Sequence, residues 1–228
     1  MRALVAGATG LVGRAVLARL VRDPRFSRVT ALLRRQDQAA SLPGGVTPLV
    51  LDVNRLGQPG APALPASDWA FCCLGTTIKQ AGSQAAFRAV DHDAVLAFAA
   101  AAQAAGARRL ALVSAMGARA ASPVFYNRVK GEVEDALRAQ QWPQLLIARP
   151  SLLLGERAAL GQPSRPGEVI AQLLMPAFGW MMPGSLRPIH ADAVAAALVR
   201  VLGDAAEGVL VLDSAQLQAL ADEPTPKR

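Results

Sequence analysis

The sequence has few cysteines, histidines and aromatic residues, and each shortage excludes a class of protein. Its 228 residues include 2 cysteines, 2 histidines and 1 tyrosine, and aromatic residues make up 4%. The cysteines are adjacent, Cys72 and Cys73, and neighbouring side chains on a strand point to opposite faces. We therefore expect no disulfide framework and no metal site, only two small buried residues in a reducing compartment.

Charged residues are also scarce, at 18%, whereas hydrophobic residues reach 52%. This balance favours a large core over disorder. The net charge of +7 could indicate a nucleic-acid partner, but the basic residues are scattered, and no run is longer than a pair, as in Arg34-Arg35 and Arg108-Arg109. Since aromatic platforms for base stacking are few as well, we expect no nucleic-acid partner.

Long uninterrupted apolar runs are absent. The N-terminus passes directly into a glycine-rich turn, which favours a strand over a signal peptide. The most membrane-like stretch, residues 169–186, contains Gln172, Pro176 and Pro183, so we expect no membrane span. These features lead us to expect a soluble, cytoplasmic protein.

Short apolar runs alternate with longer amphipathic segments, the pattern of a doubly wound α/β fold with a parallel sheet. The expected strands are residues 2–6, 28–33, 47–51, 69–74, 110–114 and 144–148. The expected helices are residues 11–21, 83–105 and 123–140. A late helix at 192–202 and a strand at 209–212 follow a less regular, proline- and glycine-rich stretch. Ligands of such sheets bind beyond the carboxyl ends of the strands.

The turn after the first strand has the features of a dinucleotide-binding loop. Gly7, Gly10 and Gly13 end the strand and open the next helix. Without Cβ atoms the backbone can approach a pyrophosphate, and free amides at a helix start attract an anion. The expected cofactor contacts in this loop are Gly7, Thr9, Gly10, Leu11, Val12 and Gly13. The alternative is a tight turn with no ligand.

The end of the second strand decides which dinucleotide is expected. NAD sites usually carry an acid there for the ribose 2′-hydroxyl, but this chain has Arg34 and Arg35. A guanidinium suits a 2′-phosphate, so the sequence predicts NADP(H) in preference to NAD(H). A solvated charge pair in a turn remains the alternative.

The single tyrosine, Tyr126, is followed four residues later by Lys130, one of three lysines. The spacing puts both side chains on one face of the helix expected over residues 123–140. A nearby ammonium favours the phenolate, so such a tyrosine could exchange a proton with a carbonyl oxygen. Ser114, at the carboxyl end of the fifth strand, could hold the same oxygen. Its alternative role is that of a turn or cap residue.

Together these residues resemble the short-chain dehydrogenase/reductase superfamily, in its extended and atypical branches. The matching motifs are Gly7-Ala-Thr-Gly-Leu-Val-Gly13 and Tyr126-Asn-Arg-Val-Lys130. Cys72-Cys-Leu-Gly-Thr-Thr77 and Ser164-Arg-Pro-Gly-Glu168 are similar to the small Tat-interacting-protein oxidoreductase group. The resemblance implies a nicotinamide-dinucleotide (Rossmann) fold over residues 1–150, with residues 151–228 as a substrate-side segment of the same domain.

The resemblance also implies roles. Tyr126 would be the acid/base, Lys130 would also clamp the cofactor ribose, and Ser114 would anchor the carbonyl. Further cofactor contacts would come from Asp52, Val53, Leu74, Gly75, Thr76 and Pro150. The family's usual Asn-Ala-Gly is replaced by Leu74-Gly75-Thr76, and its helical proton-relay asparagine has no clear counterpart, although Asp91 and His92 lie nearby.

The leading functional hypothesis is an NADP(H)-dependent oxidoreductase acting on a small, fairly apolar carbonyl or alcohol. A non-catalytic NADP(H)-binding sensor or scaffold is the second hypothesis, and a nucleotide-sugar epimerase or dehydratase-like enzyme is the third. The apolar run over residues 173–182 could line a substrate pocket or form a homodimer contact, although plain core packing is the simplest explanation.

Overall fold

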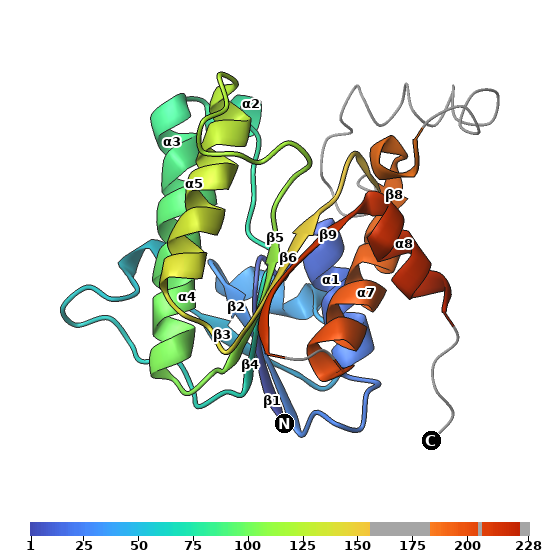
Figure 1. The fold of residues 1–228 in the computed structure, drawn as a ribbon. Helices are drawn as coiled ribbons and strands as arrows, with labels where there is room; N and C mark the ends of the chain where they lie inside the picture. The colour runs from blue at the N-terminus through green and yellow to red at the C-terminus, as the bar shows by residue number, and fades with distance from the viewer. Residues whose placement is uncertain (156–182, 205–206, 224–228) are drawn as a thin grey trace.

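The computed structural model describes residues 1–155, 183–204 and 207–223, and these form a helix–sheet–helix sandwich (Figure 1). Seven parallel strands form the sheet in the order β3-β2-β1-β4-β5-β6-β9. The strands are β1 (Arg2–Ala6), β2 (Arg28–Leu33), β3 (Val46–Val50), β4 (Trp69–Cys72), β5 (Arg109–Val113), β6 (Gln144–Arg149) and β9 (Gly208–Asp213). Two short strands, β7 (Leu153–Leu154) and β8 (Ile189–His190), pair separately.

Helices cover both faces of the sheet, as a parallel sheet requires. One face carries α1 (Leu11–Leu20), α7 (Ala191–Asp204) and α8 (Ser214–Asp222) (Figure 1). The other carries α2 (Ile78–Ala81), α3 (Gln84–Arg88), the π-helical segment η3 (Ala89–Asp93), α4 (Ala94–Ala104) and α5 (Phe125–Ala139). Short 3₁₀ turns are η1 (Gln36–Ser41), η2 (Val53–Arg55) and η6 (Gly184–Leu186).

Each strand contributes to two cores because successive side chains alternate between its faces. In β4, Trp69 and Phe71 join the cluster under α1 and α7, whereas Ala70 and Cys72 join the cluster under α4 and α5. Both faces are therefore apolar, and the strand reads as a continuous hydrophobic run. This pattern is what predicted a buried parallel sheet.

The expected doubly wound fold and its strand–helix alternation are confirmed, with local differences. β4 ends at Cys72, two residues before the predicted end, and β9 joins the main sheet as a seventh parallel strand. The single helix expected over residues 83–105 is instead α3, a π-helical turn and α4. A π-helical turn inserts a residue into the helix, which shifts the face it presents to its neighbours.

The strand order reverses between β1 and β4, where a doubly wound sheet has its topological switch point. The segments that follow these two strands therefore meet at the carboxyl edge of the sheet. Among the described residues, no helix has the length and apolar character needed to cross a bilayer. The apolar run at residues 173–182 lies outside the described residues.

Candidate functional site

The turn after β1 is built from close backbone contacts that only glycine permits. Gly7 has φ +74°, and a Cβ on it would lie 2.3 Å from the carbonyl oxygen of Cys73. A Cβ on Gly13 would lie 2.2 Å from the carbonyl oxygen of Gly7. Gly10 opens α1 without a side-chain cap and the first turn holds no acid, so within the described ranges no side chain caps the amides that open the helix. This leaves room for an anion at the helix start.

Arg14 is a part of this turn that sequence reasoning missed. Its Nε donates a hydrogen bond of 3.4 Å to the carbonyl oxygen of Thr9. The guanidinium thus lies over the loop and adds positive charge beside the helix start. The arginine directly after the third glycine of the motif was the available signal.

The two arginines after β2 have different surroundings. The side chain of Arg35 is paired with Asp37 at 3.1 Å, and this hydrogen bond lowers the pKa of the Asp37 carboxyl. Arg34 is exposed and has no acid partner within the part of the chain that the structure describes. Asp37 lies only four residues beyond the strand, and sequence reasoning gave it no role.

Asp52 and Val53, two of the expected cofactor contacts, follow β3. Asp52 is exposed and caps η2 by accepting a 3.0 Å hydrogen bond from the amide of Asn54. Val53 is buried in the core below. The pair therefore stands at the same carboxyl edge as the glycine loop, and its contact with a cofactor stays a prediction.

Tyr126 and Lys130 share one face of α5, at its amino-terminal end. The Lys130 side chain is 4% exposed, and its Nζ lies 2.8 Å from Oδ1 of Asp91, which belongs to η3. Burial acts to lower the pKa of Lys130, but the charge and hydrogen bond of Asp91, together with Tyr126 and Cys72, outweigh it and raise the pKa above the ordinary value. Tyr126 is half-buried and packs its ring against Phe87, at a centroid distance of 5.4 Å.

The segment after β4 joins the two parts of the site. On one side, the carbonyl of Cys73 crowds Gly7. On the other, the amide of Thr76 donates a 2.8 Å hydrogen bond to Oδ2 of Asp91, and a Cβ on Gly75 would lie 3.8 Å from Nζ of Lys130. The glycine loop and the Tyr126–Lys130 pair therefore lie on two sides of one short loop.

Ser114 follows β5 at the carboxyl edge, but its hydroxyl is already engaged. The Oγ donates a 2.5 Å hydrogen bond to Oε1 of Glu134, and the residue is 5% exposed. Glu134 is fully buried on α5 and accepts a 2.6 Å hydrogen bond from Arg149. A hydroxyl has one proton to donate, so Ser114 would have to rotate before it could donate to a substrate.

Pro150, another of the expected cofactor contacts, is buried directly after β6. Its carbonyl accepts a 2.9 Å hydrogen bond from the amide of Met116. The structure thus brings the segments after β5 and β6 together, next to Ser114. The motif at residues 164–168 lies outside the described residues.

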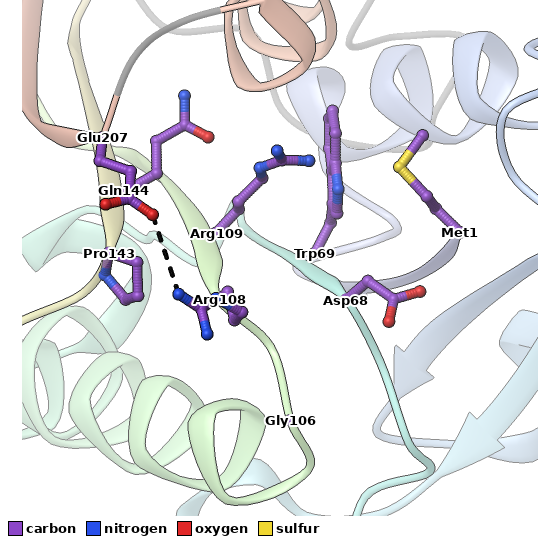
Figure 2. Close-up of a pocket in the computed structure, with 9 residues that line it drawn as sticks. All are labelled: Met1, Asp68, Trp69, Gly106, Arg108, Arg109, Pro143, Gln144 and Glu207. Atoms are coloured by element: carbon purple, nitrogen blue, oxygen red, sulfur yellow. Dashed lines mark ion pairs between the residues drawn. The ribbon is translucent and has the colours of Figure 1, made fainter.

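A cavity of about 270 Å³ lies at the opposite, amino-terminal edge of the sheet (Figure 2). The Arg109 guanidinium lies 5.0 Å from the centre of the Trp69 ring, and Arg108 faces Glu207 at 3.8 Å. This cavity is away from the carboxyl ends of the strands, where ligands of doubly wound sheets bind.

Neither cysteine has the properties of a reactive thiol. Burial raises the pKa of Cys72 to about 12 and also raises the pKa of Cys73, so both thiols keep their protons at neutral pH. In the described ranges, no three His, Cys, Asp or Glu side chains are grouped to hold a metal.

A glycine loop at the switch point and a Tyr–Lys pair across the neighbouring loop are the features of an oxidoreductase-like, dinucleotide-binding domain. The chain belongs to the NAD(P)H-binding family, whose model matches residues 7–154. It is 33% identical to protein HTATIP2 of Rattus norvegicus over 223 residues, covering 96% of this chain and 85% of the relative. This match confirms the expected family and the Tat-interacting-protein group within it.

A second relative is protein FMP52 of Eremothecium gossypii, 39% identical over 158 residues, which are 69% of this chain and 68% of the relative. Among solved structures, MoeE5 in complex with UDP-glucose and NAD superimposes with a TM-score of 0.67 at 19% identity, covering 93% of this chain and 76% of that chain. UDP-glucose 4-epimerase from Thermotoga maritima gives a TM-score of 0.69 at 14% identity, with 97% and 81% covered. At these identities the structures show the shared fold alone.

The cytoplasmic location expected from the sequence is contradicted by these relatives. The FMP52 proteins of Eremothecium gossypii, Emericella nidulans and Saccharomyces cerevisiae are mitochondrial. The expectation rested on reduced cysteines and on the lack of a long apolar run. Those features reflect core packing, and they carry no information about a targeting signal that an import receptor recognises.

Proposed function

We propose that the chain is an NADP(H)-dependent oxidoreductase that acts on a small, fairly apolar carbonyl compound or the corresponding alcohol. The observation that carries this proposal is the single loop after β4. It touches Gly7 through Cys73 and the Lys130–Asp91 pair through Gly75 and Thr76. One extended dinucleotide could therefore lie with its diphosphate on the glycine loop and its reactive end near Tyr126.

Binding would be divided among the segments at the carboxyl edge. The amides that open α1 would hold the diphosphate, and Arg34 would hold the 2′-phosphate because no acid in the described ranges neutralises it. Asp52 and Val53 would flank the adenine, and Lys130 would hold the ribose of the nicotinamide end. Arg35 contributes less, since Asp37 already pairs with it.

The residues of α5 would supply the proton chemistry. When bound, the nicotinamide would exchange a hydride with the substrate carbon. Tyr126 would give its hydroxyl proton to the carbonyl oxygen in reduction and take it back in oxidation. Ser114 would steady the same oxygen only after its hydroxyl turned away from Glu134.

The 2′-phosphate preference is tested by calorimetry with NADPH and NADH. Arg34→Ala is expected to weaken NADPH binding about tenfold or more, the cost of one charged hydrogen-bonding partner, and to leave NADH binding nearly unchanged. The matched control is Arg28→Ala, an exposed arginine at the other end of β2. If Arg34→Ala still prefers NADPH as strongly as the native chain does, the assignment of Arg34 is wrong.

Turnover is tested by following NADPH oxidation against a panel of small aldehydes and ketones. The native chain is expected to turn over at least one of them, and Tyr126→Phe is expected to lose roughly 100-fold or more in kcat, the usual contribution of a positioned acid. Phenylalanine keeps the ring contact with Phe87 and removes only the hydroxyl. Equal rates for the two proteins would exclude Tyr126 as the proton donor.

A non-catalytic NADP(H)-binding sensor is the second candidate, and one observation favours it. The Ser114 proton is committed to Glu134, which leaves the substrate oxygen without that donor. Tight NADPH binding with no turnover across the whole panel would select the sensor over the enzyme.

A further inference from the structure

Asp91 is a buried carboxylate to which the proposed proton transfer assigns no task. It is 1% exposed and lies in η3, the π-helical turn between α3 and α4. Its Oδ2 accepts a 2.8 Å hydrogen bond from the amide of Thr76, and its Oδ1 lies 2.8 Å from Nζ of Lys130. One side chain thus ties the helix pair α3–α4, the loop after β4 and α5 together.

The contact between the two helices has a regular spacing. Phe87 of α3 and Asp91 of the π-helical turn that follows it are four residues apart, and Tyr126 and Lys130 are four residues apart on α5. The ring of Phe87 meets the ring of Tyr126, and the carboxylate of Asp91 meets the ammonium of Lys130. Each member of the Tyr126–Lys130 pair therefore has its own partner, and the π-helical turn lies where the charged pair forms.

We propose that Asp91 is a positioning residue that offsets the field of the Lys130 ammonium at Tyr126, so that the tyrosine keeps its proton and the site favours carbonyl reduction. This inference rests on the proposed function, because it concerns the direction of that reaction. It gives the carboxylate two tasks, to hold the ammonium in place and to neutralise it.

The physical reason is the net charge around the phenol. An ammonium alone would stabilise the phenolate, but an ammonium paired with a carboxylate is nearly neutral at short range. From β4, the Cys72 thiol also faces Lys130, and its pKa of about 12 keeps it uncharged. His92 is next in the chain to Asp91 but pairs with Asp93. Among the described residues, Asp91 is therefore the charge near Lys130 that decides the balance.

The chain contains a single tyrosine, so absorbance of the phenolate reports Tyr126 directly and needs no substrate. In Asp91→Asn the amide oxygen can still accept from Thr76, while the negative charge is removed. The pH midpoint of phenolate formation is expected to fall by roughly one unit, the lower end of the effect of a close charge. Lys130→Met, which leaves Asp91 unopposed, is expected to raise the midpoint.

Asp93→Asn is the matched control. It removes the same charge two residues away on the same π-helical turn, where the side chain is 63% exposed and does not pair with Lys130. Its midpoint is expected to equal that of the native chain. If Asp91→Asn does not fold, the Lys130→Met titration still decides the matter.

An unmoved or raised midpoint in folded Asp91→Asn, or an unmoved midpoint in Lys130→Met, would overturn the proposal. Calorimetry with NADPH on the same samples separates this result from the proposed function. A native chain that binds no NADPH refutes the cofactor assignment, whereas an unmoved midpoint in a chain that does bind refutes only the role of Asp91.

Discussion

At single positions, the glycine-rich turn after β1 depends on residues that have no Cβ atom. Gly7 has a left-handed backbone and stands against the carbonyl of Cys73, so a methyl group there meets both a conformational and a steric obstacle. Gly57 has a similar φ of +78°, but a Cβ added to it would have nothing within 4 Å. Comparing the two positions separates the cost of the backbone conformation from the cost of crowding.

Gly57→Ala is expected to lower the free energy of unfolding by about 1–2 kcal/mol, the usual cost of a left-handed non-glycine residue. Gly7→Ala is expected to lower the free energy of unfolding clearly more, since the backbone after the neighbouring strand β4 must move. It is also expected to abolish measurable NADPH binding. Chemical denaturation and calorimetry measure the two effects. Equal losses at both positions would show that the contact with Cys73 is not tight.

Among helices and strands, α5 must be placed accurately, because it carries Tyr126 and Lys130 and fixes their position along the carboxyl edge of the sheet. Val129, Val133 and Leu137 repeat at four-residue intervals and are buried, and Val133 and Leu137 belong to the core cluster on this face of the sheet. Glu134 adds a polar anchor, since it accepts hydrogen bonds from Ser114 and from Arg149 of β6. The apolar stripe sets which face is buried, and the carboxylate sets the height along the strands.

Glu134→Gln is expected to lower the free energy of unfolding by about 2–3 kcal/mol. Breaking a fully buried pair costs more, but the Arg149 side chain is 32% exposed and keeps some solvation. Asp135→Asn is the control, because that carboxylate is 64% exposed, pairs with Arg138, and should contribute less than about 1 kcal/mol. Urea denaturation would contradict this anchor role if the two substitutions cost the same.

The helical segment that packs beside α5 on the same face of the sheet shows a feature that the sequence did not predict. Residues 83–105 are rich in alanine and predict one continuous helix, because alanine has the highest helix propensity. Propensity does not register a buried ion pair with another helix, and here the π-helical turn brings Asp91 to Lys130. The position of the helix was therefore predictable, and its interruption was not.

As a folded unit, the chain uses its C-terminal part to complete the fold. β9 pairs with β6 along its whole length, and α7 packs against α1 on the sheet. Val194, Leu198 and Leu202 of α7 are fully buried in the same cluster as Val5 of β1. We therefore propose that residues 151–228 belong to one domain with residues 1–150.

A chain cut after residue 150 is expected to lack cooperative unfolding, because α7 would no longer cover the apolar face of the sheet. The full chain is expected to unfold in one transition that NADPH shifts to higher temperature, by mass action on the folded state. Circular dichroism and tryptophan fluorescence measured on both chains check this. A cooperative transition in the shortened chain would mean two separable units.

Local chemistry was sufficient for the seven strands of the main sheet, the glycine loop and the four-residue spacing of Tyr126 and Lys130, but not for the short pair β7 and β8. Periodicity, missing Cβ atoms and helix geometry act over a few neighbouring residues, so they can be read along the chain. The pairings of Asp91 with Lys130 and of Glu134 with Ser114 and Arg149 join residues that are distant in sequence. Only tertiary packing decides them, because the desolvation of each charge depends on which elements close around it.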